Sequence, residues 1–327
     1  MSSERFATVL RAHVETWRPY TLAFPGLVGL AGAAIGEPRH SVATAVGGPL
    51  LAWLGAHYLG DYLDRHLDAL AKPQRPIPSG RLTPRAALVC AVACFAGFWL
   101  VSLLTALPLA WPAAGITLGV VVYSGAFKAR GLAGNLVRGL LTAMAFVYGT
   151  MTSVGAALWQ IIFFAAMFWA HDAATNLIGA LRDVDGDRAG GYHTLPVRRG
   201  TSAALRVAAF LYCFAIVAAI AAAIGTRDGL SIYALLLGAA SCLGVHALDI
   251  IWFAPRPLPA PTALRAHEVF VIERILITAA TISLGLGPWI TAALLTPIVI
   301  VSFLLQKLLR HQHEIAPPDS SVSAVAP

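Results

Sequence analysis

Six of the sixteen carboxylates in the chain lie in two short segments, residues 60–81 and residues 182–200. Both segments follow long apolar runs, and a carboxylate beside a membrane is costly unless it faces water, a cationic partner or a metal ion. Mg²⁺ suits such a set, because it takes oxygen ligands and commonly bridges protein carboxylates to substrate phosphates. The two segments therefore predict a magnesium site that can hold a phosphorylated substrate.

The first segment carries Asp61, Asp64 and Asp68, at spacings of three and four residues. If the preceding apolar helix continues through them, all three side chains lie on one face. Three convergent carboxylates repel one another strongly, and a divalent cation relieves that repulsion. We predict that this face binds Mg²⁺, with a solvated helix end balanced by neighbouring cations as the alternative.

The second segment carries Asp183 and Asp187 four residues apart, again on one helical face, with Asp185 turned away. We predict Asp183 and Asp187 as metal ligands and Asp185 as a residue that contacts them indirectly. Zinc is not expected, because the histidines show no spacing that would build a zinc site with these carboxylates.

Polar residues deeper in the apolar runs extend the candidate site into the membrane. The predicted cavity residues are Tyr123, Asn135, Arg138, Asp172, Asn176 and Asp185. Asp172 lies inside an apolar run, where an ionisable side chain is a functional candidate by default. A structural contact between Asp172 and His171 or His57 is the alternative interpretation.

Basic residues follow both aspartate segments and complement a diphosphate, which carries about three negative charges. The predicted diphosphate-binding residues are Lys72, Arg75, Arg81, Lys128 and Arg130. For any single one of these cations, contact with lipid headgroups is the alternative. Lys72, Arg75 and Lys128 are the strongest candidates.

The elements that must position these residues are membrane-spanning helices. The chain of 327 residues is 58% hydrophobic and 12% charged, whereas about a quarter of the residues of a soluble domain are charged. Ten apolar runs are long enough to cross a bilayer: 19–38, 43–63, 86–106, 108–126, 136–154, 157–179, 203–225, 230–253, 269–287 and 288–306. Only the Gly-Leu-Gly-Pro turn at residues 285–288 separates the last two, so they could form one broken element.

The positive charge is distributed by membrane side rather than clustered for nucleic acid. Of the 23 lysines and arginines, only Arg39 and Arg227 fall in the loops that follow the first, third, fifth, seventh and ninth apolar runs, which lie on one side of the membrane. By the positive-inside rule, the N-terminus and both aspartate segments are therefore cytoplasmic.

The N-terminal residues lack the apolar core of a cleaved signal. The four cysteines lie within predicted spans and are expected to be packing residues.

We predict one integral membrane domain over residues 1–310 and a disordered tail over residues 311–327. The tail is small, polar and proline-containing. The loops on the non-cytoplasmic side are too short for a separate soluble module. The sequence has neither a phosphate-binding glycine loop nor a G-x-S-x-G motif.

Taken together, these motifs resemble the UbiA superfamily of intramembrane aromatic prenyltransferases. Asp61, Asp64 and Asp68 with the following KPQRPIPSG look like that family's N-D-x-x-D-x-x-x-D motif and its K-P-x-R-P-I-P-S-G stretch. The second segment, with GDRAGGYHTLP, is similar to its D-x-x-x-D motif, and YSGAFKARGLAGN resembles the segment between the two. The match covers most of residues 18–200, whereas the last 120 residues add only hydropathy.

The resemblance implies an all-α bundle of nine or ten transmembrane helices around a central cavity that opens near the cytoplasmic side. It implies an enzyme in which Asp64, Asp183 and Asp187 are catalytic and two Mg²⁺ ions hold an isoprenyl diphosphate. Aromatic rings could face the allylic cation, with ordinary packing as the alternative; the candidates are Tyr62, Tyr123, Phe127, Tyr148, Phe168 and Trp169. One departure is Gly60, which stands where the family usually has the leading Asn of the first motif.

Three functions remain open on the sequence. Transfer of the prenyl group to a small aromatic or quinone-precursor acceptor is the leading hypothesis, and a terpene cyclase that needs no second substrate is the alternative. A transporter or channel with an acidic lining is disfavoured, because the carboxylates crowd at one membrane face. Prenyl chain length, acceptor identity and oligomeric state are not determined by the sequence.

Overall fold

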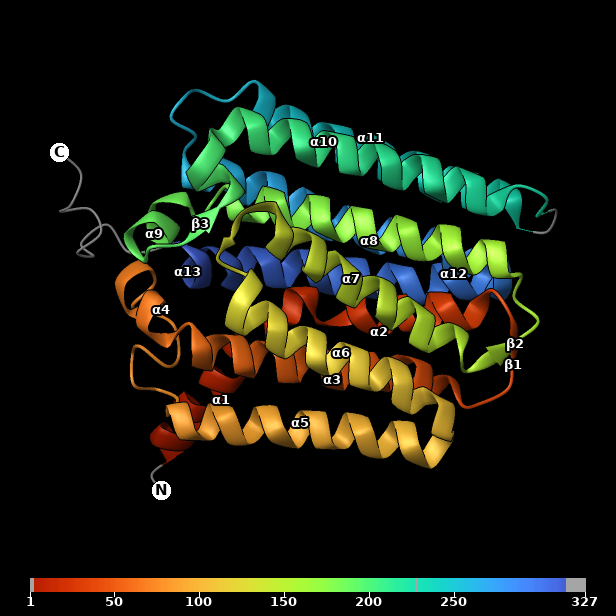
Figure 1. The fold of residues 1–327 in the computed structure, drawn as a ribbon, viewed down its shortest axis with the longest axis horizontal. Coiled ribbons are helices and arrows are strands. Elements are labelled where there is room, and N and C mark those ends of the chain that lie inside the picture. The colour runs from red at the N-terminus through yellow and green to blue at the C-terminus, as the bar shows by residue number, and fades with distance from the viewer. Residues whose placement is uncertain (1–2, 227–228, 316–327) are drawn as a thin grey trace.

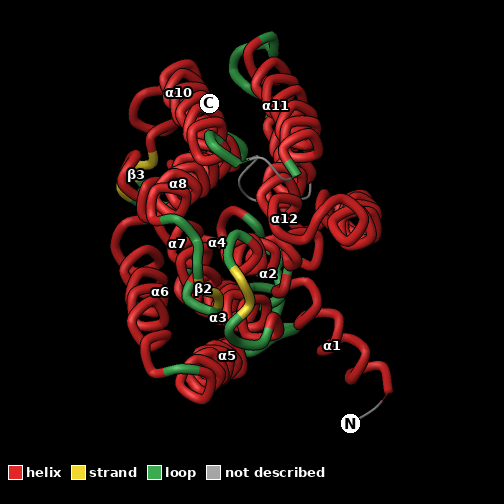
Figure 2. Tube along the Cα trace, turned by 90° about the vertical axis from the view of Figure 1, so that its right-hand side faces the viewer, coloured by secondary structure: helices red, strands yellow, loops and turns green. Residues whose placement is uncertain are grey.

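Long helices lie side by side along the long axis of the molecule in the computed structural model, which describes residues 3–226 and 229–315 (Figure 1). The helices of the bundle are α2 (Pro19–Ala34), α3 (Val42–Leu63), α5 (Pro84–Thr105), α6 (Ala110–Val122), α7 (Gly131–Thr150), α8 (Leu158–Ala180), α10 (Leu195–Ala223), α11 (Leu230–Trp252) and α12 (Ala260–Leu305). Viewed from one end, they are arranged around a centre rather than in flat layers (Figure 2).

Short elements lie at the two ends of the bundle. They are α1 (Ser3–Trp17), α4 (Arg65–Ala71), η1 (Leu107–Leu109), η2 (Tyr123–Phe127), α9 (Val184–Ala189), η3 (Gln306–Arg310), α13 (His311–Glu314) and the strands β1 (Glu37–Pro38), β2 (Ser153–Val154) and β3 (His193–Thr194). Helices α4, α9 and α13 gather at one end, whereas β1 and β2 pair antiparallel at the other (Figure 1). The loops that carry the two aspartate segments therefore share one end of the molecule.

Eight helices among the described residues are long and apolar enough to cross a membrane. Helix α2 is shorter but equally apolar and is largely buried within the bundle. These helices confirm the predicted polytopic helical bundle, and each of the ten predicted apolar runs is helical over most of its length. Arg227, which we predicted on the far side, lies outside the described residues.

Helix α12 reverses direction at Gly287, where φ is 72° and ψ is 176°. Before the reversal, Gly285 lies against the backbone carbonyl of Ala34 at the C-terminal end of α2. After it, the Ser302 hydroxyl donates to the carbonyl of Tyr20, near the N-terminal end of α2, at 2.7 Å. The runs 269–287 and 288–306 are thus two antiparallel arms, which we call the first and second arms of α12.

The second arm leads the chain back to the end of the bundle that holds α4 and α9. There, residues 311–314 form α13, so the predicted disorder does not begin at His311. The helix continues because Glu314 gains buried ionic partners there, which composition does not reveal. The rest of the predicted tail, residues 316–327, lies outside the described residues.

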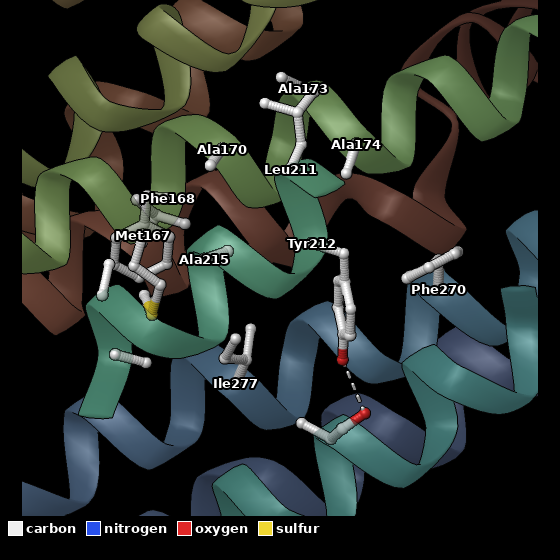
Figure 3. Packing of buried hydrophobic residues seen from close by; sticks show 14 of the residues in the cluster. Met167, Phe168, Ala170, Ala173, Ala174, Leu211, Tyr212, Ala215, Phe270 and Ile277 are labelled. Carbon is white, nitrogen blue, oxygen red and sulfur yellow. Dashed lines mark hydrogen bonds between the residues drawn. The ribbon is translucent and has the colours of Figure 1, made fainter. Parts of the chain in front are cut away.

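Small residues allow the helices to approach closely. A Cβ atom on Gly149 of α7 would lie 1.9 Å from the carbonyl oxygen of Gly29 on α2, so only glycine fits this crossing. Larger apolar side chains fill the interior between α8, α10 and α12, where Tyr212 and Phe270 pack edge to face (Figure 3). Tyr148 and Phe168 are two of the aromatic rings proposed to face the allylic cation. Both are fully buried among apolar side chains.

The crossing at Gly149 generates a stability prediction. Gly149→Ala places a methyl group against the backbone of α2, which cannot rotate away, and overpacking of this kind destabilises by about 1–3 kcal/mol. We expect a lower thermal unfolding temperature in detergent, measured by the fluorescence of the eight tryptophans. Gly238→Ala in α11, where an added Cβ meets nothing within 4 Å, is the matched control. Equal stability of the two variants would contradict this description of the crossing.

Candidate active site

The first aspartate cluster is held by a helix that continues almost without interruption from α3 into α4. The backbone amides of Asp64, Asp68 and Lys72 each donate to the carbonyl four residues earlier, at 2.8 Å. Asp61, Asp64 and Asp68 therefore share one face, as predicted, and all three are buried. They line a cavity of about 420 Å³.

The second aspartate cluster follows α8, where Asp183 is the residue before α9 and Asp187 lies within it. Helix α9 packs directly on α4: a Cβ atom on Gly186 would lie 2.7 Å from the Cβ of Ala71. This close contact brings Asp183 and Asp187 to the wall of the same cavity as the first cluster. Spacing within either segment could not predict this contact, because α4 and α9 are more than a hundred residues apart in the chain.

Three of the predicted diphosphate-binding cations pair with the predicted metal ligands. Lys128 contacts Asp64, Arg75 Nη1 lies 2.9 Å from Asp68 Oδ1, and Lys72 Nζ lies 2.8 Å from Asp183 Oδ1. All six side chains line the cavity. Oppositely charged groups thus share a buried wall, and each pair holds its members in place until a charged ligand competes for them.

The remaining aspartates have different surroundings. Asp61 Oδ1 accepts from Arg18 Nη2 at 2.7 Å, whereas its Oδ2 is buried with no hydrogen-bond partner among the described residues. Asp187 accepts from the Thr194 hydroxyl at 3.1 Å, and burial, followed by the charge of Asp183, raises the pKa of Asp187 to about 6. Asp61 is therefore engaged by an arginine that the sequence did not reveal as a partner.

The deeper wall of the cavity is polar, as predicted. Asp172 accepts from Arg138 Nε at 3.3 Å and from the Thr142 hydroxyl at 2.9 Å. The alternative partners considered for Asp172 are occupied elsewhere, because His171 contacts Glu273 and His57 contacts the backbone of residue 16. The predicted cavity residues Tyr123, Asn135 and Asn176 also line the cavity.

Asp185 lies at the rim of the cavity rather than inside it. Its side chain is 86% exposed and pairs with Arg188 at 3.4 Å. The structure thus agrees with the prediction that Asp185 turns away from the two neighbouring aspartates. Gly60 lies on the cavity wall, and a Cβ atom at this position would meet nothing within 4 Å. The space that the family's usual Asn would occupy is therefore open.

Two predicted diphosphate-binding residues do not line the cavity. Arg81 donates to the carbonyl of Gln74 and pairs with Glu15 of α1 at 2.7 Å, so it fastens α1 to the loop after α4. Arg130 is exposed at the start of α7, beside β3. Both arginines follow an aspartate or lysine motif in sequence, but the turn after each motif carries them outward.

The arrangement matches a known family. The UbiA prenyltransferase family model matches residues 22–256. The chain belongs to this family. It is 35% identical over 207 residues to a digeranylgeranylglyceryl phosphate synthase of Natronomonas pharaonis, a match that covers 61% of this chain and 73% of the other. It is 33% identical over 224 residues to the protein of the same name from Methanopyrus kandleri, with 67% and 80% covered.

Solved structures of UbiA homologues share the fold. A UbiA homologue from Archaeoglobus fulgidus bound to GPP and Mg²⁺ has a TM-score of 0.65 at 16% identity, covering 91% of this chain and 99% of that one. A structure described as a digeranylgeranylglyceryl phosphate synthase has a TM-score of 0.62 at 20% identity, covering 85% and 99%. The protein is thus a multi-pass membrane prenyltransferase of the UbiA family.

The donor atoms of this UbiA cavity suit magnesium. Within the described ranges, no three His, Cys, Asp or Glu side chains are close enough to enclose an ion, and Asp183 and Asp64 are paired with Lys72 and Lys128. Mg²⁺ needs only one or two protein carboxylates when water and phosphate oxygens complete its octahedron. Each wall of the cavity offers two carboxylates, enough for one Mg²⁺ ion. They are Asp64 and Asp68 on one wall, and Asp183 and Asp187 on the other.

Several cavity residues were missed by sequence reasoning, and they are Arg18, Arg182, Tyr192, His267, Arg274, Arg310 and Glu314. Glu314 comes from the segment that we predicted to be disordered. Its Oε2 atom lies 3.2 Å from Lys72 Nζ, 3.0 Å from Arg75 Nη2 and 3.3 Å from Arg182 Nη2. Three cations thus converge on one carboxylate oxygen, as they would on a phosphate oxygen.

The charges around Glu314 decide its protonation. Burial disfavours the ionised form, but the nearby charges of Arg182, Lys72 and Arg75 outweigh burial and hold the pKa of this carboxyl well below its ordinary value. The backbone of the same segment is fixed by Gln74, whose amide donates to the carbonyl of Ile315 at 3.0 Å. An ionised glutamate therefore occupies part of the cationic wall at neutral pH.

We expect Glu314→Gln to lower the KM for the prenyl diphosphate by about tenfold, because a hydrogen bond between charged groups is worth about 1.5–3 kcal/mol. The substitution removes the carboxylate that competes for Lys72 and Arg75. Steady-state kinetics and the inhibition constant of inorganic pyrophosphate measure the effect. Glu37→Gln, exposed at the opposite end of the molecule, is the control. An unchanged KM in Glu314→Gln would show that the carboxylate does not compete with the substrate.

Proposed function

We propose that this UbiA-family enzyme transfers an isoprenyl group from an isoprenyl diphosphate to a hydroxyl of a glyceryl phosphate lipid, with Mg²⁺ as cofactor. The observation that carries the proposal is the pairing of two aspartate clusters with Lys72, Arg75 and Lys128 around one buried cavity. A cavity lined by both charges suits a substrate that is itself anionic and that binds together with a divalent cation.

The reaction makes a specific electrostatic demand on these residues. As the bond between C1 of the prenyl chain and the diphosphate oxygen breaks, the electron pair and negative charge pass to the diphosphate. Lys72, Arg75 and Lys128 would stabilise that charge more strongly in the transition state than in the bound substrate. Bound Mg²⁺ would supply further positive charge to the leaving group. The acceptor hydroxyl oxygen then bonds to C1, and its proton is released.

The relatives favour a different acceptor from the aromatic one expected from the sequence. Both synthases described above are named for digeranylgeranylglyceryl phosphate, a product in which the prenyl groups are attached to a glyceryl phosphate. Their acceptor would therefore carry a glycerol hydroxyl and a phosphate rather than an aromatic ring. Arg274 on the cavity wall, which forms no ion pair among the described residues, supports an anionic acceptor here.

We also propose that the cavity opens toward the cytoplasm and that residues 1–310 form one membrane domain. The distribution of lysine and arginine between the two membrane sides supports this orientation. The ends of α3, α8 and α12, with the loops that carry both aspartate clusters, lie together at one end of the bundle (Figure 1).

Product analysis with purified protein tests the acceptor class. We expect Mg²⁺-dependent transfer from geranylgeranyl diphosphate to geranylgeranylglyceryl phosphate, detected by mass spectrometry, and no product with 4-hydroxybenzoate. Release of a cyclic hydrocarbon without any acceptor would replace transfer with cyclisation. Prenylation of 4-hydroxybenzoate alone would restore the aromatic acceptor.

The metal ligands are tested by substitution. We expect Asp64→Ala and Asp183→Ala each to lower kcat/KM by at least about a hundredfold, because lost metal coordination removes several kcal/mol of transition-state stabilisation. The exposed Asp185→Asn variant is the control and should retain activity. Full activity of Asp64→Ala or Asp183→Ala, assayed at saturating Mg²⁺, would rule out the proposed metal site.

A further inference from the structure

Arg274 is a buried cation that forms no ion pair with any residue that the structure describes. It lies in the first arm of α12, and its side chain is 5% exposed. Among the residues that the structure describes, no carboxylate lies within ion-pair distance of its guanidinium, and its Nε and Nη2 atoms make no hydrogen bond. Its guanidinium carbon lies 4.5 Å from the centre of the Phe24 ring. An unpaired arginine within a membrane segment is costly and is therefore a candidate for binding a ligand.

The carboxylates nearest to Arg274 in the fold are already satisfied. Glu273, its neighbour in the chain, accepts from the Tyr212 hydroxyl at 3.0 Å and contacts His171 Nε2 at 2.6 Å. Asp172 is held by Arg138 and Thr142. The other arginines of the aspartate-lined cavity have polar partners within the protein. Arg18, Arg75, Arg138 and Arg182 each pair with a carboxylate, and Arg310 contacts Gln306 and His267. Arg274 therefore keeps its capacity for an anion that does not belong to the protein.

A second cavity, of about 190 Å³, lies on the other side of Arg274. It runs between α2 and the two arms of α12, and its wall is almost entirely apolar, with Phe24, Ile275 and Ile298 among its residues. Tyr20, Thr21 and Arg274 line both this apolar cavity and the aspartate-lined cavity. Val301, which lines the apolar cavity, is 52% exposed on the second arm, so the cavity lies next to the apolar outer face of that arm.

We propose that Arg274 binds the phosphate of a lipid whose hydrocarbon chain lies in the apolar cavity. A guanidinium matches a phosphate with two parallel hydrogen bonds, and the apolar wall beside it suits a hydrocarbon chain. The phosphate head then lies at the boundary of the aspartate-lined cavity, where a hydroxyl next to the phosphate can reach the prenyl donor. This site would provide a cation for the acceptor that is separate from Lys72, Arg75 and Lys128. The inference rests on the proposed prenyl transfer to a lipid.

Binding measurements on the detergent-purified full chain, without prenyl diphosphate, test the site directly. The probes are a long-chain alkyl glyceryl phosphate, the matching neutral alkyl glycerol and inorganic phosphate. We expect the wild-type protein to bind the lipid phosphate at least about tenfold more tightly than either other probe, and Arg274→Gln to remove that preference. Arg265→Gln, at an exposed arginine nearer the start of α12, is the matched control. Equal binding of the lipid phosphate by Arg274→Gln and wild type, or equal binding of inorganic phosphate and the lipid phosphate, would overturn the proposal.

A second variant separates ligand binding from folding. Ile298→Trp fills the apolar cavity and leaves Arg274 in place. We expect weaker binding of the alkyl glyceryl phosphate and unchanged binding of inorganic pyrophosphate with Mg²⁺. If Arg274→Gln does not fold, unchanged lipid binding in Ile298→Trp overturns the proposal.

Kinetics distinguish this site from the proposed function. We expect Arg274→Gln to raise the KM for the lipid phosphate acceptor at least about tenfold while the KM for the prenyl diphosphate stays unchanged. Failure of the wild-type protein to transfer a prenyl group to any glyceryl phosphate lipid, with Arg274-dependent lipid binding intact, would refute the proposed function and leave the site standing. Transfer with the same acceptor KM in wild type and Arg274→Gln would refute the site.

Discussion

The balance of charge between buried aspartates and buried cations governs how the active end of the bundle is built. Asp64, Asp68 and Asp183 would be energetically costly at a membrane boundary without close partners, and Lys128, Arg75 and Lys72 supply those partners. The same balance restricts what can enter the cavity. A neutral ligand would leave these ion pairs undisturbed, whereas a diphosphate with Mg²⁺ can replace both partners of each pair at once.

Close helix packing allows this balance to form. The first cluster is presented by α4 and the second by α9, and the contact of Gly186 with Ala71 leaves no room for a larger side chain between them. The two helices are short and would not be stable alone. They are held by the long spans α3 and α8 to which they are attached, and these spans pack through α7 in the interior. The membrane bundle therefore sets the separation of the carboxylates.

The reversal of α12 at Gly287 brings residues from the end of the chain to the site. It folds the last membrane segment back along α2 and delivers Gln306–Glu314 to the mouth of the cavity. One consequence is the insertion of Glu314 among Lys72, Arg75 and Arg182. Another is the apolar cavity between α2 and the two arms of α12, with Arg274 at its inner end. In the proposed reaction, the prenyl donor and the lipid acceptor would thus meet beside α12, where the two cavities share Arg274.

The sequence by itself determined the ten apolar segments, the helical face shared by Asp61, Asp64 and Asp68, and the four-residue spacing of Asp183 and Asp187. These features depend on local periodicity, so reading along the chain is sufficient. Only the tertiary structure decided that α4 and α9 touch, that Arg81 and Arg130 turn outward, and that Glu314, Arg18 and Arg274 enter the cavity. Those outcomes depend on contacts between residues far apart in the chain, and a glycine reversal or a buried charge pair leaves no periodic signal in the sequence.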